Sequence, residues 1–414
     1  MGYTKDTIRG ISWLGAFRIF YRAVSFFRTI IFARILSPFQ FGVYGIVTFV
    51  LALIEILTET GINVFLVQKK EEIDKYVNTA WVVSILRGML IAVSVFLSSF
   101  LVADFFKNHQ VVPLLMLTAL VPLIRGFINP SVAAFQKNLK FKREFYYRSS
   151  IFLVDSFVSV VLILIVKNVT ALVYGLIAGA FFEVAISFLF VRPLPMIKFD
   201  KAIFKEIVSH GKWVTGAGIF GYLFQNADNI IVGKILGIAS LGIYDMAYTI
   251  SLLPITEFSD IVARVVFPVY VKISDDKKRL KLAYIKTAVV TAVMVSPMLF
   301  IFLLFPKELI LIVLGSKWIE VSGILRILAI FAFINMLGSP TGAAFYSIGK
   351  QKYLTIVSVI SFVTMVVIII PLINILGLAG GAYSALISSL VTLPVQYYFL
   401  TKTLSDKSSY EGNK

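Results

Sequence analysis

Long apolar runs recur along nearly the whole chain, and they restrict the fold more than any other feature of the sequence. A run of about 20 apolar residues is long enough to cross a bilayer as a helix. Hydrophobic residues make up 59% of the 414 positions and the mean hydropathy is +0.91, more than the core of a soluble domain would bury. Because lipid offers no partner for unpaired backbone groups, each run is expected to be helical. The sequence therefore predicts an all-α polytopic membrane protein.

The apolar runs predict about twelve transmembrane helices. They cover residues 11–33, 41–66, 79–103, 111–134, 149–166, 170–191, 213–235, 241–267, 283–305, 322–346, 353–373 and 377–400. Lys5 and Arg9 precede a first run of full length, so this helix is expected to remain as a signal anchor. The sequence has no cysteine, which excludes disulfides and thiolate metal sites.

The distribution of basic residues predicts the orientation. The chain has 39 Lys and Arg residues, and most lie in segments that are cytoplasmic if the N-terminus is cytoplasmic. The loops that would then lie outside hold only Arg34, Lys107, Lys167, Lys234, Lys307 and Lys317. By the positive-inside rule both termini face the cytoplasm, and the protein is expected in the cell (cytoplasmic) membrane. The net charge of +17 is explained by insertion and by anionic membrane lipids, so no nucleic acid is expected as a partner.

Three short sequence segments, called repeated phrases below, occur twice in the chain in the same order. "FARILSPFQFGVYG" (32–45) and "VGKILGIASLGIYD" (232–245) share Ile, Leu, Gly and Tyr at an offset of 200 residues. The other pairs are "NPSVAAFQKNLKF" (129–141) with "SPTGAAFYSIGKQ" (339–351), and "GLIAGA" (175–180) with "GLAGGA" (377–382). Each phrase falls on the corresponding helix of a six-helix half. The repeat predicts two pseudo-symmetric six-helix lobes inserted the same way up, as in parallel-repeat transporters.

The repeat also predicts the domain boundaries. Residues 1–192 form an N-terminal six-helix lobe, 193–212 a cytoplasmic amphipathic linker, and 213–414 a C-terminal six-helix lobe with a short cytoplasmic tail. The linker carries an apolar helical face, which is typical of a helix lying in the membrane interface. This face consists of Ile203, Phe204, Ile207 and Val208.

A polar stripe runs through the first apolar helix. Arg18, Arg22, Ser25 and Thr29 follow an i, i+4, i+7, i+11 spacing, with Arg28 on the flank. An arginine near the bilayer centre costs about 2.5–3.5 kcal/mol on insertion scales, so these side chains should face a wet cavity or a partner. Guanidinium groups supply the charge-assisted, bidentate donors that a pyrophosphate needs. The three arginines are predicted to bind substrate; the alternative is that they snorkel or pair within the bundle.

The repeat extends this stripe into the second half. Adding 200 residues gives Gln225 and Asn229 and, opposite in charge to Arg28, Asp228. These three residues complete the predicted substrate-binding set. Arg28 and Asp228 would pair in one state of a transport cycle and separate in another; a static structural pair is the alternative.

Two carboxylates in the second run are candidates for ion coupling. Glu55 and Glu59 are spaced i, i+4, which on a helix puts them on one face, and adjacent carboxylates raise each other's pKa. Such pairs suit coupling to H⁺ or Na⁺. Asp155 and Glu183 are further candidates for a coupling cation, with a position near a span end or a bridge between helices as the alternative. For Arg87 and Arg125 we expect structural pairing between helices.

Several loop and helix-end motifs resemble those of a known family. "ARILSPFQFGVYG" (33–45), "LVQKKEEIDKYVNTAW" (66–81) and "AAFQKNLKFKREF" (133–145) resemble the Wzx-type polysaccharide flippases. These belong to the multidrug/oligosaccharidyl-lipid/polysaccharide exporter superfamily, with the multidrug and toxin extruders and the lipid II flippase. The resemblance implies a V-shaped pair of six-helix lobes that carries polyprenyl-linked oligosaccharide to the outer leaflet by alternating access, for cell-surface polysaccharide. It makes other polysaccharide assembly proteins candidate partners.

Few features of the sequence support a catalytic function. No G-x-x-x-x-G-K-[ST] loop is present, and His109 and His210 belong to no ligand cluster. We therefore expect no catalytic residue, no metal and no cofactor beyond a coupling H⁺ or Na⁺. The alternatives are a cation-coupled multidrug exporter of the same fold and a membrane glycan polymerase or glycosyltransferase. The longest outer loop, about 306–321, is short for an enzyme that must hold an acceptor sugar.

Overall fold

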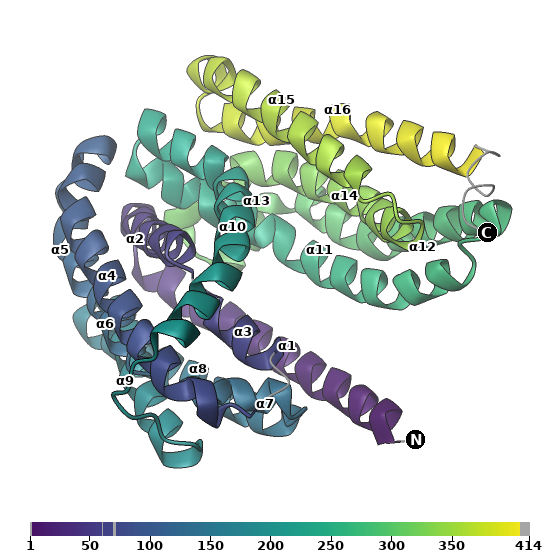
Figure 1. The fold of residues 1–414 in the computed structure, drawn as a ribbon. Coiled ribbons are helices and arrows are strands. Elements are labelled where there is room, and N and C mark those ends of the chain that lie inside the picture. Colours follow the sequence, from purple (N-terminus) through teal and green to yellow (C-terminus); the bar gives the residue numbers. More distant parts are fainter. Residues whose placement is uncertain (1, 60, 69–71, 406–414) are drawn as a thin grey trace. The chain divides into compact units, whose positions relative to one another are not determined.

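The computed structural model describes residues 2–59, 61–68 and 72–405, and this part of the chain is helical without any strand (Figure 1). Every predicted membrane segment overlaps a helix. The long helices are α1 (Gly2–Ile35), α2 (Pro38–Leu57), α4 (Asp74–Phe106), α8 (Phe141–Val166), α9 (Thr170–Phe190), α10 (Lys201–Leu236), α11 (Ile238–Lys272), α12 (Lys277–Leu304), α14 (Val321–Ser347), α15 (Lys352–Leu376) and α16 (Leu378–Ser405). Eight helices of the described residues are long and apolar enough to span a membrane, or nine with one bent pair. The all-α polytopic class is confirmed, and twelve spans stay a prediction.

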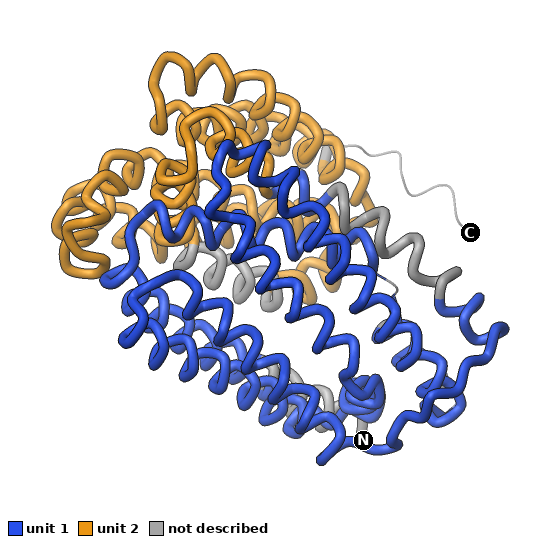
Figure 2. Tube along the Cα trace, turned by 90° about the vertical axis from the view of Figure 1, so that its left-hand side faces the viewer, with its two compact units in different colours: residues 1–225 blue, residues 226–414 orange. Residues whose placement is uncertain are grey.

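Contacts divide the chain into two compact units, residues 1–225 and 226–414 (Figure 2). The division falls inside α10, which runs without interruption past residue 212. The apolar face predicted for the linker contacts protein: Ile203 packs against a buried cluster that includes Ile207 and Phe65. Val208 lies outside the described side chains. The predicted lobe boundaries are not tested by this division and stay a prediction.

The predicted second span, 41–66, is broken in the structure. Helix α2 ends at Leu57, and a separate short helix, α3 (Ile62–Gln68), follows. Thr58 is the C-cap of α2, and Gly61, directly before α3, has φ 64, a left-handed conformation that favours glycine and does not fit a continuous helix. Its amide donates to the Glu59 carboxylate over 2.8 Å. Glu59 therefore lies beyond the end of α2, and the prediction that it shares a helical face with Glu55 is wrong.

The predicted fourth span, 111–134, is also interrupted. It consists of α5 (Val111–Thr118), α6 (Leu120–Arg125), a 3₁₀ turn η1 (Pro130–Ala133) and α7 (Ala134–Lys137), with a bend of 73°. Pro130 forces the preceding Asn129 out of the helical region, to φ −65 and ψ 114. The Asn129 side chain caps η1 by accepting from the Ser131 amide, and it donates to the Pro193 carbonyl over 3.0 Å. The bend is thus fixed by proline and its cap.

The first repeated phrase marks a tight break between two helices in each unit. In the first copy Ser37 caps α2, accepting from the Gln40 amide while the Gln40 side chain accepts from the Ser37 amide, and Pro38 occupies the first helical turn. In the second copy Gly237, at φ 88, separates α10 from α11 without a side-chain cap. The two copies make the same turn by different means.

Glycines of the third repeated phrase let neighbouring helices approach closely, as small residues do in membrane bundles. A Cβ on Gly175 of α9 would meet the Ser159 side chain of α8 and lie 2.8 Å from the Asp155 carbonyl oxygen. In unit 2, a Cβ on Gly380 of α16 would meet the Leu372 carbonyl of α15. The same close pairing of consecutive helices therefore occurs in both units.

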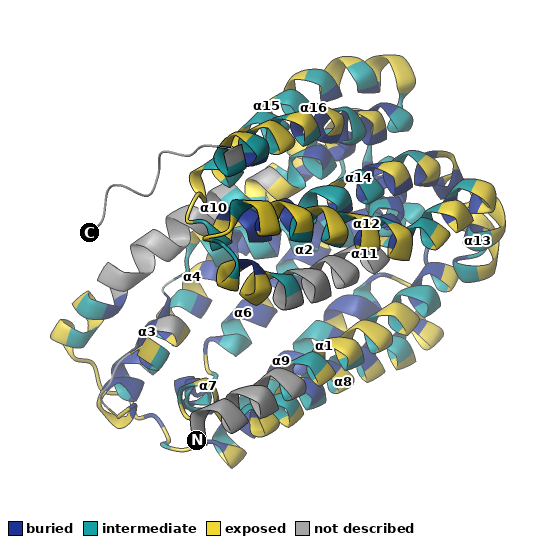
Figure 3. Cartoon of the chain, turned by 90° about the vertical axis from the view of Figure 1, so that its right-hand side faces the viewer, coloured by how far each residue is buried: buried dark blue, intermediate teal, exposed yellow. Residues whose placement is uncertain are grey.

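Exposed residues recur along the outer helices (Figure 3), and many of them are large apolar side chains. On α15 the exposed face has helical spacing and consists of Ile356, Val359, Val363, Val367 and Ile370. A surface of this kind suits contact with lipid.

Candidate functional site

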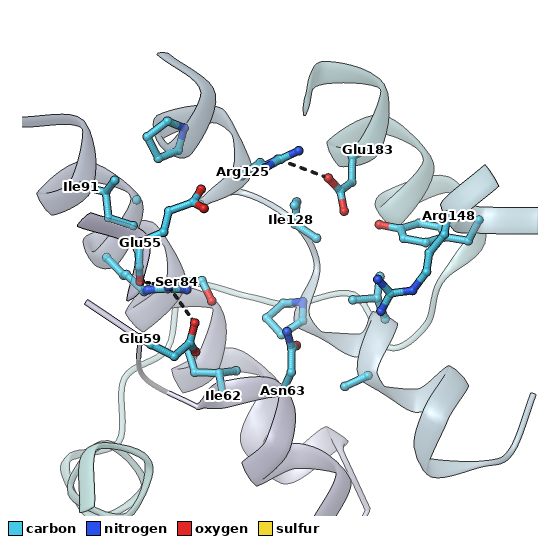
Figure 4. A pocket seen from close by; sticks show the side chains of 18 of the residues that line it. Glu55, Glu59, Ile62, Asn63, Ser84, Ile91, Arg125, Ile128, Arg148 and Glu183 are labelled. Atoms are coloured by element: carbon cyan, nitrogen blue, oxygen red, sulfur yellow. Dashed lines mark hydrogen bonds and ion pairs between the residues drawn. The ribbon is translucent and has the colours of Figure 1, made fainter. Parts of the chain in front are cut away.

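A cavity of about 590 Å³ lies within unit 1 (Figure 4). Its walls are formed by the C-terminal ends of α2 and α6, the N-terminal halves of α4 and α8, and the C-terminal half of α9. The charged residues lining it are Glu55, Glu59, Arg87, Arg125, Glu144, Arg148 and Glu183. Charged groups in helices of this apolarity are expensive unless they pair or face a wet cavity, so their convergence indicates a functional site.

Arg87 of α4 holds the broken end of α2. Its guanidinium donates to the backbone carbonyls of Thr58 and Glu55, each over 2.8 Å, and to the Glu59 carboxylate over 2.9 Å. These carbonyls lie at the C-terminus of α2, where helical carbonyls lack intrahelical partners and a cation is favourable. Arg87 and Glu59 therefore have a structural reason to pair.

Two further ion pairs line the opposite side of the cavity. Arg125 of α6 faces Glu183 of α9, with Nε 3.6 Å from a carboxylate oxygen (Figure 4). The Glu144 carboxylate accepts from Arg148 over 2.8 Å and from the Gln136 amide over 2.7 Å. The expectation that Arg87 and Arg125 pair between helices agrees with these contacts, as does the alternative that Glu183 bridges helices.

Glu55 differs from the other carboxylates of the cavity. Its side chain projects from α2 into the cavity (Figure 4), and among the described residues no hydrogen bond or ion pair engages its carboxylate. Glu55 and Glu59 thus line one cavity, although only Glu59 has an arginine partner. The ion-coupling role predicted for Glu55 and Glu59 stays a prediction.

The predicted arginine stripe lies on α1, and its members have different environments. Arg28 donates to the Asp155 carboxylate of α8 over 2.7 Å and lies over the Phe152 ring at 5.2 Å. Its side chain is 17% exposed. Arg18 and Arg22 are exposed. Within unit 1 the partner of Arg28 is Asp155, and its predicted pairing with Asp228 of unit 2 stays a prediction.

The predicted residues of the second half lie along α10. Asp228 is buried and accepts from the Tyr244 hydroxyl of α11 over 3.0 Å and from the Asn229 amide over 2.9 Å. The Asn229 side-chain oxygen is buried without a hydrogen-bond partner among the described residues. Gln225 is exposed, at the last position of unit 1. The roles predicted for these residues stay predictions.

Several residues of the cavity were not predicted from the sequence. Glu144, Arg148, Gln136 and Tyr147 all line it, yet only Gln136 and Glu144 fall in a motif noted in the sequence, 133–145, and none of the four was predicted as a site residue. The i, i+4 spacing of Glu144 and Arg148 was a usable signal for an ion pair. Their meeting with α2, α4 and α9 depends on the bend at Pro130 and was not readable from spacing.

Comparison with known proteins identifies the family. The profile of the family described as "Polysaccharide biosynthesis protein" matches residues 31–323. The chain belongs to this family. As a polysaccharide biosynthesis protein with many apolar helices it is a multi-pass membrane protein, and the resemblance to Wzx-type flippases is confirmed.

Several relatives align with most of the length of the chain. It is 25% identical over 345 residues to "Lipopolysaccharide biosynthesis protein WzxC" of Escherichia coli (strain K12), covering 83% of the chain and 70% of that protein. It is 26% identical over 406 residues to a membrane protein of the cps region of Klebsiella pneumoniae, covering 97% and 84%. "Teichuronic acid biosynthesis protein TuaB" of Bacillus subtilis (strain 168) is 24% identical, covering 72% and 62%.

Solved structures share the fold of this polysaccharide biosynthesis protein. A structure described as "Lipid II flippase MurJ, inward closed conformation" aligns with a TM-score of 0.73 at 16% identity, covering 94% of the chain and 87% of that structure. An inward-facing multidrug resistance MATE family transporter of the MOP superfamily aligns with a TM-score of 0.66 at 17% identity, covering 93% and 94%. At these identities the likeness concerns the fold alone.

Proposed function

We propose that this protein moves polyprenyl-(pyro)phosphate-linked oligosaccharide from the cytoplasmic to the outer leaflet by alternating access, for cell-surface polysaccharide biosynthesis. The observation that carries the proposal is a cavity lined by paired charges inside a lipid-facing helical unit of a polysaccharide biosynthesis protein. Such a cavity suits a polar cargo that must pass through the apolar part of the bilayer. Relatives named for lipopolysaccharide and teichuronic acid biosynthesis support it.

The charged side chains have separate proposed roles. Arg18 and Arg22 are exposed on α1 and bind the phosphate groups of the lipid. Arg28 is held by Asp155 and reaches the substrate only when that pair opens. Gln225, Asp228 and Asn229 complete the substrate site in the second half.

Coupling is proposed to use H⁺ or Na⁺ at Glu55 and Glu59. Glu55 offers a carboxylate without an ion-pair partner among the described residues, so it is the primary binding group. Glu59 contributes through its pair with Arg87, which keeps the end of α2 in place. In this role the protein is a carrier and not an enzyme.

The proposed location is the cytoplasmic membrane, with both termini in the cytoplasm. In that orientation the unit 1 cavity lies near the cytoplasmic loop 136–148, the side from which a lipid-linked sugar is loaded. Membrane lipids and other proteins of polysaccharide assembly are the proposed partners.

A reconstituted assay tests the proposal. The purified protein in liposomes should speed the movement of a fluorescent undecaprenyl-pyrophosphate-linked sugar from the inner to the outer leaflet, measured by quenching with an impermeant reductant. Protein-free liposomes and the Arg22→Ala variant are the controls. No movement of this lipid, together with proton-driven export of a cationic dye such as ethidium, would instead establish the multidrug exporter.

A further inference from the structure

Three buried polar atoms of the cavity of unit 1 have no hydrogen-bond partner among the described residues. They are Nε of Arg125, which lies 3.6 Å from the Glu183 carboxylate, a carboxylate oxygen (Oε2) of Glu144 and the hydroxyl of Tyr147. Buried polar atoms in native proteins are nearly always paired, so unpaired ones call for an explanation such as a bound molecule. Glu144 is 4% exposed, and its other carboxylate oxygen is fully engaged by Arg148 and Gln136. The cavity therefore has unused bonding capacity at fixed positions.

A ligand that pairs with all three atoms must both donate and accept hydrogen bonds. Arg125 Nε is a donor, Glu144 Oε2 is an acceptor, and the Tyr147 hydroxyl is both. A phosphate at neutral pH offers acceptors and negative charge, so beside Glu144 it would leave the carboxylate unsatisfied and repelled. Sugar hydroxyls both donate and accept hydrogen bonds, so they can pair with all three atoms.

The charge of the cavity favours the same ligand. The described lining has three arginines and four glutamates, so with all groups ionised it has no positive excess to hold a phosphate. The arginine–glutamate pairs instead present donors and acceptors side by side (Figure 4). A volume of about 590 Å³ lies in the usual range of ligand sites, roughly 300–1,000 Å³.

We propose that the cavity of unit 1 binds sugar residues of the lipid-linked cargo, at a site separate from the arginines of α1 that bind its phosphates. The proposal rests on the proposed flippase function. Arg125, Glu144 and Tyr147 form hydrogen bonds with the sugar hydroxyls. The cavity thereby selects for the glycan part of the lipid.

Cysteine protection tests the proposal in the full-length protein. The chain has no cysteine, and Asn63 is an exposed residue of the cavity wall, so Asn63→Cys introduces one reporter thiol. Lipid-linked glycan extracted from the membranes of the producing cells should slow its reaction with a hydrophilic maleimide, whereas undecaprenyl pyrophosphate should not. Asn168→Cys, in the exposed loop between α8 and α9, is the control and should react equally with either lipid.

A conservative variant supplies a second readout. Tyr147→Phe in the Asn63→Cys background removes one hydroxyl and should raise the lipid-linked glycan concentration for half-protection about tenfold. The same change should leave retention of radiolabelled undecaprenyl pyrophosphate by immobilised protein unchanged, a result that a merely misfolded variant would not give.

The outcomes separate this inference from the proposed function. Equal protection of Asn63→Cys by undecaprenyl pyrophosphate would show a phosphate site and overturn the inference. So would an Asn63→Cys protein that moves the lipid-linked glycan at the wild-type rate without any protection. If the wild-type protein neither binds nor moves either lipid, the flippase function itself falls and the inference falls with it.

Discussion

At the scale of single residues, the charged side chains of unit 1 divide into those with fixed partners and those without. Arg28 has Asp155, Arg87 has Glu59 and two carbonyls, whereas the Glu55 carboxylate has no such partner among the described residues. Removing one member of a buried ion pair leaves the other charge uncompensated. Substitutions of paired and unpaired residues should therefore affect stability differently, even where both reduce transport.

Substitutions of Glu55 and Glu59, the two carboxylates proposed for ion coupling, should differ in this way. Glu55→Gln should reduce transport driven by an imposed ion gradient while leaving thermal stability and substrate binding unchanged. Glu59→Gln should weaken the pair with Arg87, which is partly exposed, and so lower the stability by roughly 1 kcal/mol as well as reduce transport. Gradient-driven uptake in liposomes and thermal melting in detergent measure the two effects. Undiminished coupling in the Glu55→Gln, Glu59→Gln double variant would remove both residues from this role.

Two arginines of α1 should be tested separately. Arg22→Ala should strongly reduce transport, with Arg22→Lys restoring only part because the planar fork is lost. Arg28→Ala should destabilise the protein by about 3 kcal/mol, since the Asp155 side chain, only 13% exposed, loses its ion-pair partner.

The matched control for Arg28 is the double variant Arg28→Gln, Asp155→Asn, which removes both charges. It should recover most of the stability without recovering transport. Wild-type flipping rates for Arg22→Ala combined with Arg28→Ala would mean that the arginine stripe is structural and the phosphates bind elsewhere.

At the scale of helices, the breaks position the site more than the spans do. Helix α2 ends at Leu57, and the left-handed Gly61 holds the Glu59 carboxylate through its amide where Arg87 also reaches it. Pro130 lies at the 73° bend of the fourth segment, which also carries Arg125. Close packing of α8 on α9 then brings Glu144 and Glu183 to the same cavity. The geometry of the site therefore depends on Gly61, which lies outside the cavity lining, and on Pro130, which is part of it.

The close approach of α8 and α9 is testable with two glycines. Gly175→Ala places a Cβ against the Ser159 side chain and the Asp155 carbonyl, so it should lower the stability by about 1–3 kcal/mol. Gly45→Ala in α2 is the matched control because nothing lies within 4 Å of its added Cβ. Thermal melting of the two variants in the same detergent compares them. Equal melting temperatures would contradict the tight packing of the two helices.

At the scale of the whole molecule, the outer faces of the helices and the distribution of lysine and arginine determine how the chain sits in a membrane. Exposed valine and isoleucine follow one face of α15, while the basic residues collect in loops at helix ends. If each half has six segments, as the sequence repeat predicts, both halves enter the membrane in the same direction. In the predicted orientation the cavity of unit 1 lies at the cytoplasmic end of its helices.

The orientation should be visible by labelling intact cells. Single cysteines at Asn138 and Asp275, in the loops 136–148 and 268–282, should be shielded from an impermeant maleimide added outside. A cysteine at Asn168, in a loop of the opposite side, should react. Labelling at Asn138 or Asp275 in unbroken cells would overturn the twelve-segment topology.

The sequence by itself determined the helical membrane class, the position of nearly every long helix, and the family. These follow from composition, run length and loop motifs, which are local: an apolar stretch must be a helix in lipid wherever it packs. The repeated phrase at Ser37 and Gly237 marked a helix break in each half for the same reason, because caps and turns are read from neighbouring residues.

Only the tertiary structure decided which charges meet. The i, i+4 spacing of Glu55 and Glu59 predicts that they share one face of a continuous helix. The chain is not helical at Gly61, and Arg87 of another helix donates to the Glu59 carboxylate. Arg28 was matched by symmetry to Asp228, and within its own unit it pairs with Asp155. A charge in a membrane helix must find a partner, yet sequence spacing constrains partners only along one helix. Partners on other helices depend on bends and close approaches, which is why the charged cavity emerged from the packing alone.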